Sequence, residues 1–241
     1  MFSPLASRNQ KELLRDPLSF VFGLVLPIFL LYFVSILQKS APADVFKMEN
    51  FAPSIAIFSF SFISLFSGTL LAKDRSSSFL TRLFASPLSS TDYILSYSVP
   101  LIFVAILQTV ICLTAAVFMG LPVTSNLMFT VVILIFISFL FIGIGLLFGA
   151  LFTDKQVGGI FAVLVQVVAL LSGMWFDLKL FGGVVEGISY ALPFAHAVEV
   201  TRATMAGDLG GVLPHVLWVV GYTLVTFVAA VIVFKRRMKE D

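Results

Sequence analysis

Six long apolar runs constrain the fold of this 241-residue chain more than any other feature of its sequence. A bilayer core of about 30 Å needs about 20 apolar residues in helical form to cross it. The runs are continuously apolar, whereas barrel strands are shorter and alternate in polarity. They predict an all-α integral membrane protein with six transmembrane helices in a single transmembrane domain, residues 1–241. The predicted spans are residues 18–37, 51–72, 93–119, 127–152, 157–176 and 214–234.

The composition excludes several classes of protein. Hydrophobic residues make up 59% of the chain and charged residues only 12%, whereas a soluble domain carries about 25% charged residues. The net charge is +2, and no basic cluster alternates with aromatic residues, so nucleic acid is not an expected partner. The single cysteine, Cys112, lies inside an apolar run and cannot form an internal disulfide.

The most polar internal stretch, residues 73–92, separates the second and third predicted spans. Its apolar residues fall at helical spacing and its two arginines share another face, so it predicts a short amphipathic helix. Serines 76–78 can cap the helix start, and a proline ends it. Such a helix is suited to contact a separate motor protein in the cytoplasm. The residues assigned to this coupling role are Arg75, Phe79, Leu80, Arg82, Leu83, Phe84 and Pro87.

Two further segments are expected to lie at the membrane surface. Residues 1–17 place apolar side chains near one helical face and charged ones elsewhere, which predicts an interfacial helix. Residues 177–211 are too apolar for a water-exposed loop, yet they carry several charges and are broken by Gly182, Gly183 and Pro193. They predict short external re-entrant helices between spans five and six, which line or cap a pathway. The polar residues singled out there are Glu186, His196, Glu199 and Arg202.

The lysines and arginines predict the orientation. With six spans, one side of the membrane receives most of them, and the other receives only Lys39, Lys47, Lys179 and Arg202. By the positive-inside rule, both termini and residues 73–92 are cytoplasmic.

Polar residues inside the spans allow two interpretations. Gln108, Thr109 and Gln166 either hydrogen-bond between helices or line a substrate path. Gly145 and Gly149 form a GxxxG pair, which permits close approach of another helix. Glu199 can pair with Arg202 or with His196 on one helical face, and a structural pair is favoured over a substrate site.

Motifs for chemistry are absent from the sequence. There is no GxxxxGK[ST] phosphate loop and no HExxH, and the chain has only two histidines. We therefore expect no catalytic, cofactor-binding or metal-binding residues in this chain.

Three features together resemble the membrane subunits of ABC-2 type ABC transporters. They are the stretch LTRLFASPLSSTDYILSYSVP at residues 80–100, the six-span layout with an N-terminal interfacial helix, and SGMWF followed by ISYALPFAHAVEVTRA at residues 172–176 and 188–203. The family often opens its coupling loop with Glu-Arg-Glu-x-Gly-Thr, whereas this chain has KDRSSS at residues 73–78.

The resemblance implies a permease subunit of an ATP-driven exporter in a bacterial or archaeal plasma membrane. The working unit would contain two permeases, either two copies of this chain or one copy and a homologue, and two ATP-binding-cassette subunits that bind ATP and Mg²⁺. The substrate would be a drug, a peptide or a lipid-like molecule. The alternatives are an exporter of a lipid-linked glycan, a membrane-embedded enzyme using His196 with Glu199 or Asp177, and a passive channel.

Overall fold

The computed structural model describes residues 2–15, 21–40, 44–77 and 89–240, and the described part of the chain is helical with no strand. Two 3₁₀ turns, Asp44–Phe46 and Leu178–Leu180, lie in the connections. The helices are α1 (Phe2–Arg15), α3 (Leu26–Ser40, preceded by a π-helical segment Val21–Val25), α4 (Met48–Ser76), α6 (Ser90–Phe118), α7 (Ser125–Leu151), α8 (Asp154–Leu171), α9 (Gly183–Ala191), α10 (Pro193–Ala206) and α11 (Leu209–Glu240).

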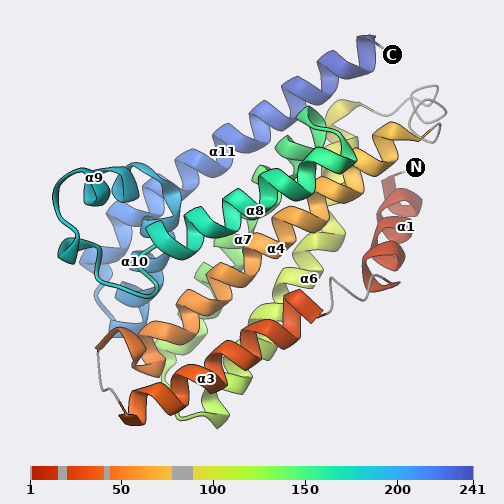
Figure 1. Ribbon diagram of the computed structural model, residues 1–241. Helices are drawn as coiled ribbons and strands as arrows, with labels where there is room; N and C mark the ends of the chain where they lie inside the picture. The colour runs from red at the N-terminus through yellow and green to blue at the C-terminus, as the bar shows by residue number, and fades with distance from the viewer. Residues whose placement is uncertain (1, 16–20, 41–43, 78–88, 241) are drawn as a thin grey trace.

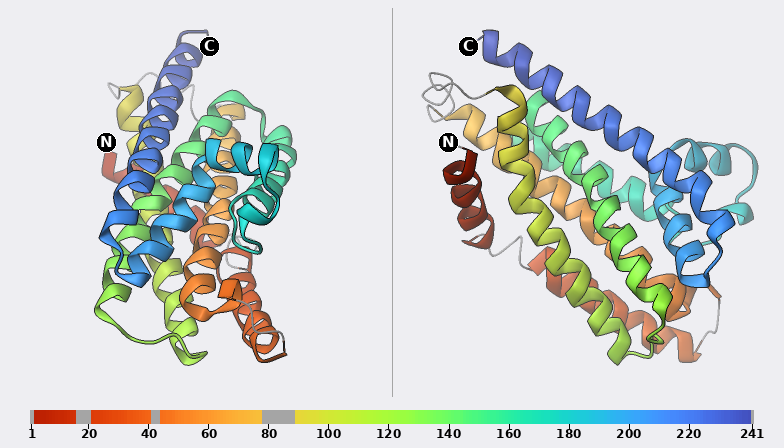
Figure 2. Two further views of the ribbon diagram at one scale, coloured as in Figure 1. Left: turned by 90° about the vertical axis from the view of Figure 1, so that its left-hand side faces the viewer. Right: turned by 180° about the vertical axis from the view of Figure 1, so that it is seen from behind.

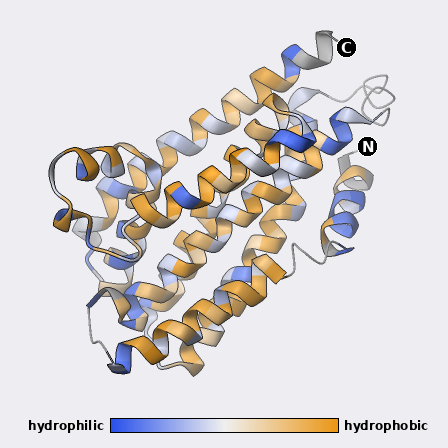
Figure 3. Cartoon of the chain, in the orientation of Figure 1, coloured by the Kyte–Doolittle hydropathy of each residue, from blue (hydrophilic) through white to orange (hydrophobic). Residues whose placement is uncertain are grey.

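Six of these helical segments are long and apolar enough to cross a membrane, which confirms the predicted all-α architecture. They run side by side as an elongated bundle, and the short helix α1 packs against α6 at one end of it (Figure 1). Both chain termini lie at that same end, as an even number of crossings requires (Figures 1 and 2). Most residues along the helices between the two ends are hydrophobic (Figure 3).

Helix α4 forms the centre of the bundle. Nearly all of its residues between Phe51 and Ala72 are buried, and it packs most extensively against α7 and α8. The closest contact is made by glycines: a Cβ atom added to Gly145 would lie 2.3 Å from the Ser64 carbonyl oxygen, and one added to Gly149 would lie 2.5 Å from the Gly68 carbonyl oxygen. The predicted GxxxG pair of α7 therefore forms a tight helix contact, with α4 as its partner.

The helix ends differ from the predicted span limits where polar side chains find partners. Helix α4 continues through Lys73, Asp74 and Arg75 to Ser76, so these residues belong to its last turn. Helix α8 begins at Asp154 and ends at Leu171, shortly before Gly173, whose φ of +76° favours glycine.

The predicted breaks in the segment between the fifth and sixth spans coincide with helix boundaries. Gly182 and Gly183 both have positive φ angles and precede the body of α9, and Pro193 opens α10. Proline is tolerated at that first position because its missing N–H would have no helical partner there. Two short helices thus connect the fifth and sixth spans, and their depth in the membrane remains a prediction.

Candidate functional site

A buried polar network joins α1, α4 and α6 at the end of the bundle that holds the termini. The guanidinium of Arg8 donates to both carboxylate oxygens of Asp74, one of them at 2.8 Å. The hydroxyl of Tyr97 donates to the same carboxylate at 2.7 Å. Asn9 is fully buried beside them and donates to the Ser96 carbonyl oxygen. Three helices that are distant in the sequence are therefore held together around Asp74.

Each carboxylate of this network is paired with the guanidinium of Arg8. The Asp74 side chain is only 5% exposed, whereas that of Arg8 is 36% exposed and also pairs with Glu12 at 2.8 Å. The hydrogen bonds to Asp74 raise the pKa of Arg8 above its already high usual value. A carboxylate in the last turn of a helix is unfavourable to the helix dipole, so Asp74 depends on its partners.

Arg75, one residue further along α4, binds a different helix. Its guanidinium donates to the carbonyl oxygens of Gly149, at 2.9 Å, and Ala150. These carbonyls belong to the last turn of α7, where no helical N–H is available to them. Neighbouring residues of α4 thus reach α1 and α6 through Asp74, and α7 through Arg75.

The residues assigned to the coupling role lie directly after this point. Arg75 is in the last turn of α4. The other six, Phe79, Leu80, Arg82, Leu83, Phe84 and Pro87, fall outside the described residues, so their role stays a prediction. Beyond them, Ser89 and Asp92 form a capping box at the start of α6.

The predicted substrate-path residues fall into two environments. Gln108 and Thr109 on α6 are almost fully buried, and neither side chain has a hydrogen-bond partner among the described residues. Gln166 lies on the exposed face of α8, away from the bundle interior. The three residues therefore do not form one lining.

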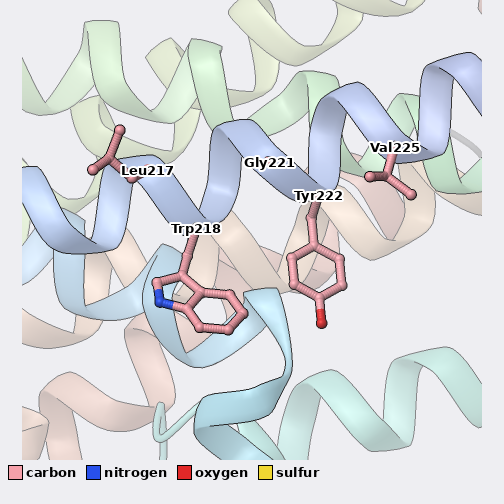
Figure 4. A pocket seen from close by; sticks show the side chains of 5 residues that line it. All are labelled: Leu217, Trp218, Gly221, Tyr222 and Val225. Atoms are coloured by element: carbon pink, nitrogen blue, oxygen red, sulfur yellow. The ribbon is translucent and has the colours of Figure 1, made fainter.

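The segment between the fifth and sixth spans, together with α11, contains an aromatic cluster that the sequence did not predict. The ring of His196 stacks on Trp218 with centroids 4.9 Å apart, and Trp218 stacks on Tyr222. Trp218 and Tyr222 project from the same side of α11 beside a groove of about 590 Å³ (Figure 4). His196 and Tyr222 also bind the carbonyl oxygens of Tyr190 and Ala191, at 2.9 and 2.6 Å, so α9, α10 and α11 are tied at one place.

The two histidines of the chain bind each other. Their Nδ1 atoms are 2.7 Å apart, and His196 Nε2 lies 2.9 Å from the Tyr190 carbonyl oxygen. Because a carbonyl only accepts, Nε2 of His196 carries the proton and donates it. In the neutral pair, His196 Nδ1 then accepts a hydrogen bond from His215 Nδ1–H. Both ring nitrogens of His196 are therefore engaged.

The other polar residues predicted in this segment, Glu186, Glu199 and Arg202, make contacts that support its helices. Arg202 donates to the Gly173 carbonyl oxygen at 3.0 Å, which ties α10 to the chain after α8. Its other guanidinium nitrogen is 4.0 Å from Glu199, so the predicted Glu199–Arg202 pair is present but long. Burial lowers the pKa of Arg202. Glu186 lies in the first turn of α9, where the helix dipole favours an acidic residue.

The family model described as ABC-2 type transporter matches residues 2–206, from α1 to the end of α10. The chain belongs to the ABC-2 type transporter family. The match includes the Asp74 network, the segment proposed for coupling and the His196 region, whereas α11 lies beyond it. No curated protein is significantly similar to the chain.

In this ABC-2 type transporter, the described residues offer no obvious place for a metal. No group of three His, Cys, Asp or Glu side chains gathers in the part of the chain that the structure describes. The histidine pair is instead an internal tie between α10 and α11.

The histidine pair predicts a loss of stability in acid. Burial lowers the pKa of His196, so below pH about 6.5 the unfolded chain binds more protons than the folded chain. The stabilisation is complete above that pH and is lost as the pH falls through the lowered pKa. If both imidazoles were protonated, the Nδ1–H groups of His196 and His215 would face each other, and neither nitrogen could accept a hydrogen bond.

We expect the apparent melting temperature of the purified protein to fall between pH 7 and pH 5. His196→Gln is the matched control, because an amide can donate to Tyr190 and accept from His215 without titrating in this range. The variant should show a weaker pH dependence than the wild type. Equal pH dependence in both proteins would contradict the role of His196.

Proposed function

We propose that this chain is the transmembrane permease subunit of an ATP-driven ABC exporter in a bacterial or archaeal plasma membrane, with both termini cytoplasmic. The substrate class is a drug, a peptide or a lipid-like molecule. The observation that carries the proposal is the Asp74–Arg75 junction in a chain of the ABC-2 type transporter family. This junction binds three other helices immediately before the segment proposed to contact the motor.

A separate subunit is needed to supply the energy. The chain has no phosphate-binding loop, so ATP and Mg²⁺ would be bound by an ATP-binding-cassette partner. Its contact surface would be made by residues 78–88 and by α1. Because Arg8 fixes α1 to Asp74, a displacement of either element would act on the end of α4. Arg75 extends the connection to α7, against which α4 is most tightly packed.

Such a transmission needs two states of the bundle that the motor stabilises differently. The polar contacts suit this role because each one joins α4 to a particular neighbouring helix. The glycine contact brings the backbones of α4 and α7 so close that a Cβ atom added to Gly145 or Gly149 would meet the α4 backbone, so we infer that these two helices move together.

The outer face of α8 supports a second permease in the working unit. Gly158, Ala162 and Gln166 are spaced four residues apart and are all exposed. A Cβ atom added to Gly158 would meet nothing within 4 Å. Small residues at this spacing let another helix approach closely, and an amide in hydrocarbon is costly without a partner. A second copy packed on α8 would bury the stripe and pair Gln166, at or beside the substrate path.

The enzyme alternative is disfavoured by the contacts of His196. Both of its ring nitrogens are hydrogen-bonded and the residue is only 6% exposed. A general base needs a free lone pair within reach of a substrate.

The proposal is tested by gentle purification of the chain from its native membrane, with identification of co-purifying proteins and the mass of the complex. We expect a soluble protein with a GxxxxGK[ST] loop and two permease copies. Recovery of the chain alone in several detergents would contradict the proposal.

The coupling role predicts the effect of one double variant. Arg82→Ala with Phe84→Ala should keep the complex assembled and hydrolysing ATP while export in reconstituted vesicles falls at least tenfold. Lys155→Ala, in the first turn of α8, is a control at the same end of the bundle and should leave export unchanged. Normal export by a well-expressed double variant would exclude this role.

A further inference from the structure

An apolar groove of about 270 Å³ runs between α6 and α11 near the end of the bundle that holds the termini. One wall comes from the first two turns of α6 and the other from the second half of α11. The groove opens on the outside of two membrane-spanning helices, and Leu95, Val228 and Ile232 are each about half exposed. Its lining residues are Thr91, Ile94, Leu95, Phe227, Val228, Val231 and Ile232.

Two cations continue the groove beyond its apolar part. Residues four apart lie on the same face of a helix. Lys235 therefore follows Val231, and Arg236 follows Ile232, one turn closer to the end of α11. Both cations are exposed. At the same end, Thr91 places a hydroxyl group in the groove wall. The groove is thus apolar at membrane depth and positively charged at its mouth.

The only acidic residue in the first turn of α6 is occupied in a cap. The carboxylate of Asp92 accepts from the backbone N–H and the hydroxyl of Ser89, at 2.9 and 2.6 Å. Tyr93 and Phe234, both fully buried, are in ring contact between the two helices. The groove therefore leads outward to the two cations.

We propose that this groove is a binding site for an anionic phospholipid. One acyl chain would lie against the apolar walls, and the phosphate would be held by Lys235 and Arg236, with Thr91 as a hydroxyl donor. Apolar burial and charge attraction then act at opposite ends of one amphipathic ligand. The site depends only on the membrane-spanning helices and is independent of the transported substrate.

Charge sets the expected selectivity. A lysine or arginine near an anionic membrane surface contributes about a fivefold preference, so two cations predict about a 25-fold preference for an anionic lipid over a zwitterionic one. The apolar walls should add affinity for both lipids without discriminating between them.

The test uses the full-length protein in mild detergent, equilibrated with equal amounts of phosphatidylglycerol and phosphatidylcholine, with bound lipids identified by native mass spectrometry. We expect the wild type to retain one phosphatidylglycerol in preference to phosphatidylcholine. Lys235→Gln with Arg236→Gln should abolish the preference. Arg15→Gln with Lys155→Gln removes the same charge from the same end of the bundle and should retain it.

Filling the groove provides a second, charge-neutral test. Val228→Trp should lower retention of both lipids, whereas Leu213→Trp, on an exposed position at the other end of α11, should not. Equal retention of the two lipids by the wild type would overturn the proposal, as would a preference that survives loss of Lys235 and Arg236. If both charge variants lost the lipid preference equally, the preference would come from the net charge of the protein and not from this groove, and the proposal would be overturned. Release of a bound polypeptide by Val228→Trp would assign the groove to a protein partner.

Discussion

Arg8→Ala is expected to lower the free energy of unfolding by about 3 kcal/mol, because it leaves the Asp74 carboxylate buried without its charged partner. The value lies at the low end for buried pairs, since Arg8 itself is 36% exposed and is partly solvated in the folded protein. The apparent melting temperature of the purified protein in detergent measures the effect. Transport should fall in parallel if α1 acts on α4 through this pair.

Two variants separate the charge effect from a simple loss of contacts. Adding Asp74→Asn to Arg8→Ala removes the unpaired charge and keeps an acceptor for Tyr97, so the double variant should recover about 1–2 kcal/mol. Glu12→Gln removes only the partly exposed partner of Arg8 and should cost less than about 1 kcal/mol. A double variant less stable than Arg8→Ala alone would show that the Asp74 charge is not the source of the loss.

The apolar pattern was sufficient to predict the architecture. Each span is specified by a continuous run of apolar residues. The breaks at Gly182, Gly183 and Pro193 are likewise specified by local sequence. The limits of the spans were less predictable where polar residues take part in the fold. Helix α4 extends past Ala72 because Asp74 and Arg75 find partners on other helices, which hydropathy does not register.

The polar contacts were missed for the same reason. Arg8 was placed on the polar face of an interfacial helix, but its partner is 66 residues away. Arg75 was assigned to a motor contact, and the structure places its guanidinium on the end of α7. One signal was present in the sequence: a carboxylate in the last turn of an apolar helix implies a cationic partner. Its identity depends on how the helices pack.

Gly145→Ala should be the most damaging single-methyl substitution in the bundle, with a cost of about 3 kcal/mol or more, because it forces α4 and α7 apart. The new Cβ atom would lie 1.8 Å from the Ser67 hydroxyl oxygen and 2.3 Å from the Ser64 carbonyl oxygen. A hydroxyl can rotate away, whereas the carbonyl belongs to the backbone of α4. The melting temperature and the yield of monodisperse protein report the loss.

The same substitution at Gly221 is the matched control. That glycine lies on the exposed side of α11, where an added Cβ meets nothing within 4 Å. Alanine there should be neutral or stabilising by up to about 1 kcal/mol, because it restricts the unfolded chain and favours helix. Ser67→Ala combined with Gly145→Ala should recover little, since the clash with the Ser64 backbone remains. Substantial recovery in that double variant would mean that α4 and α7 can separate easily, and they would then not move together as the coupling proposal requires.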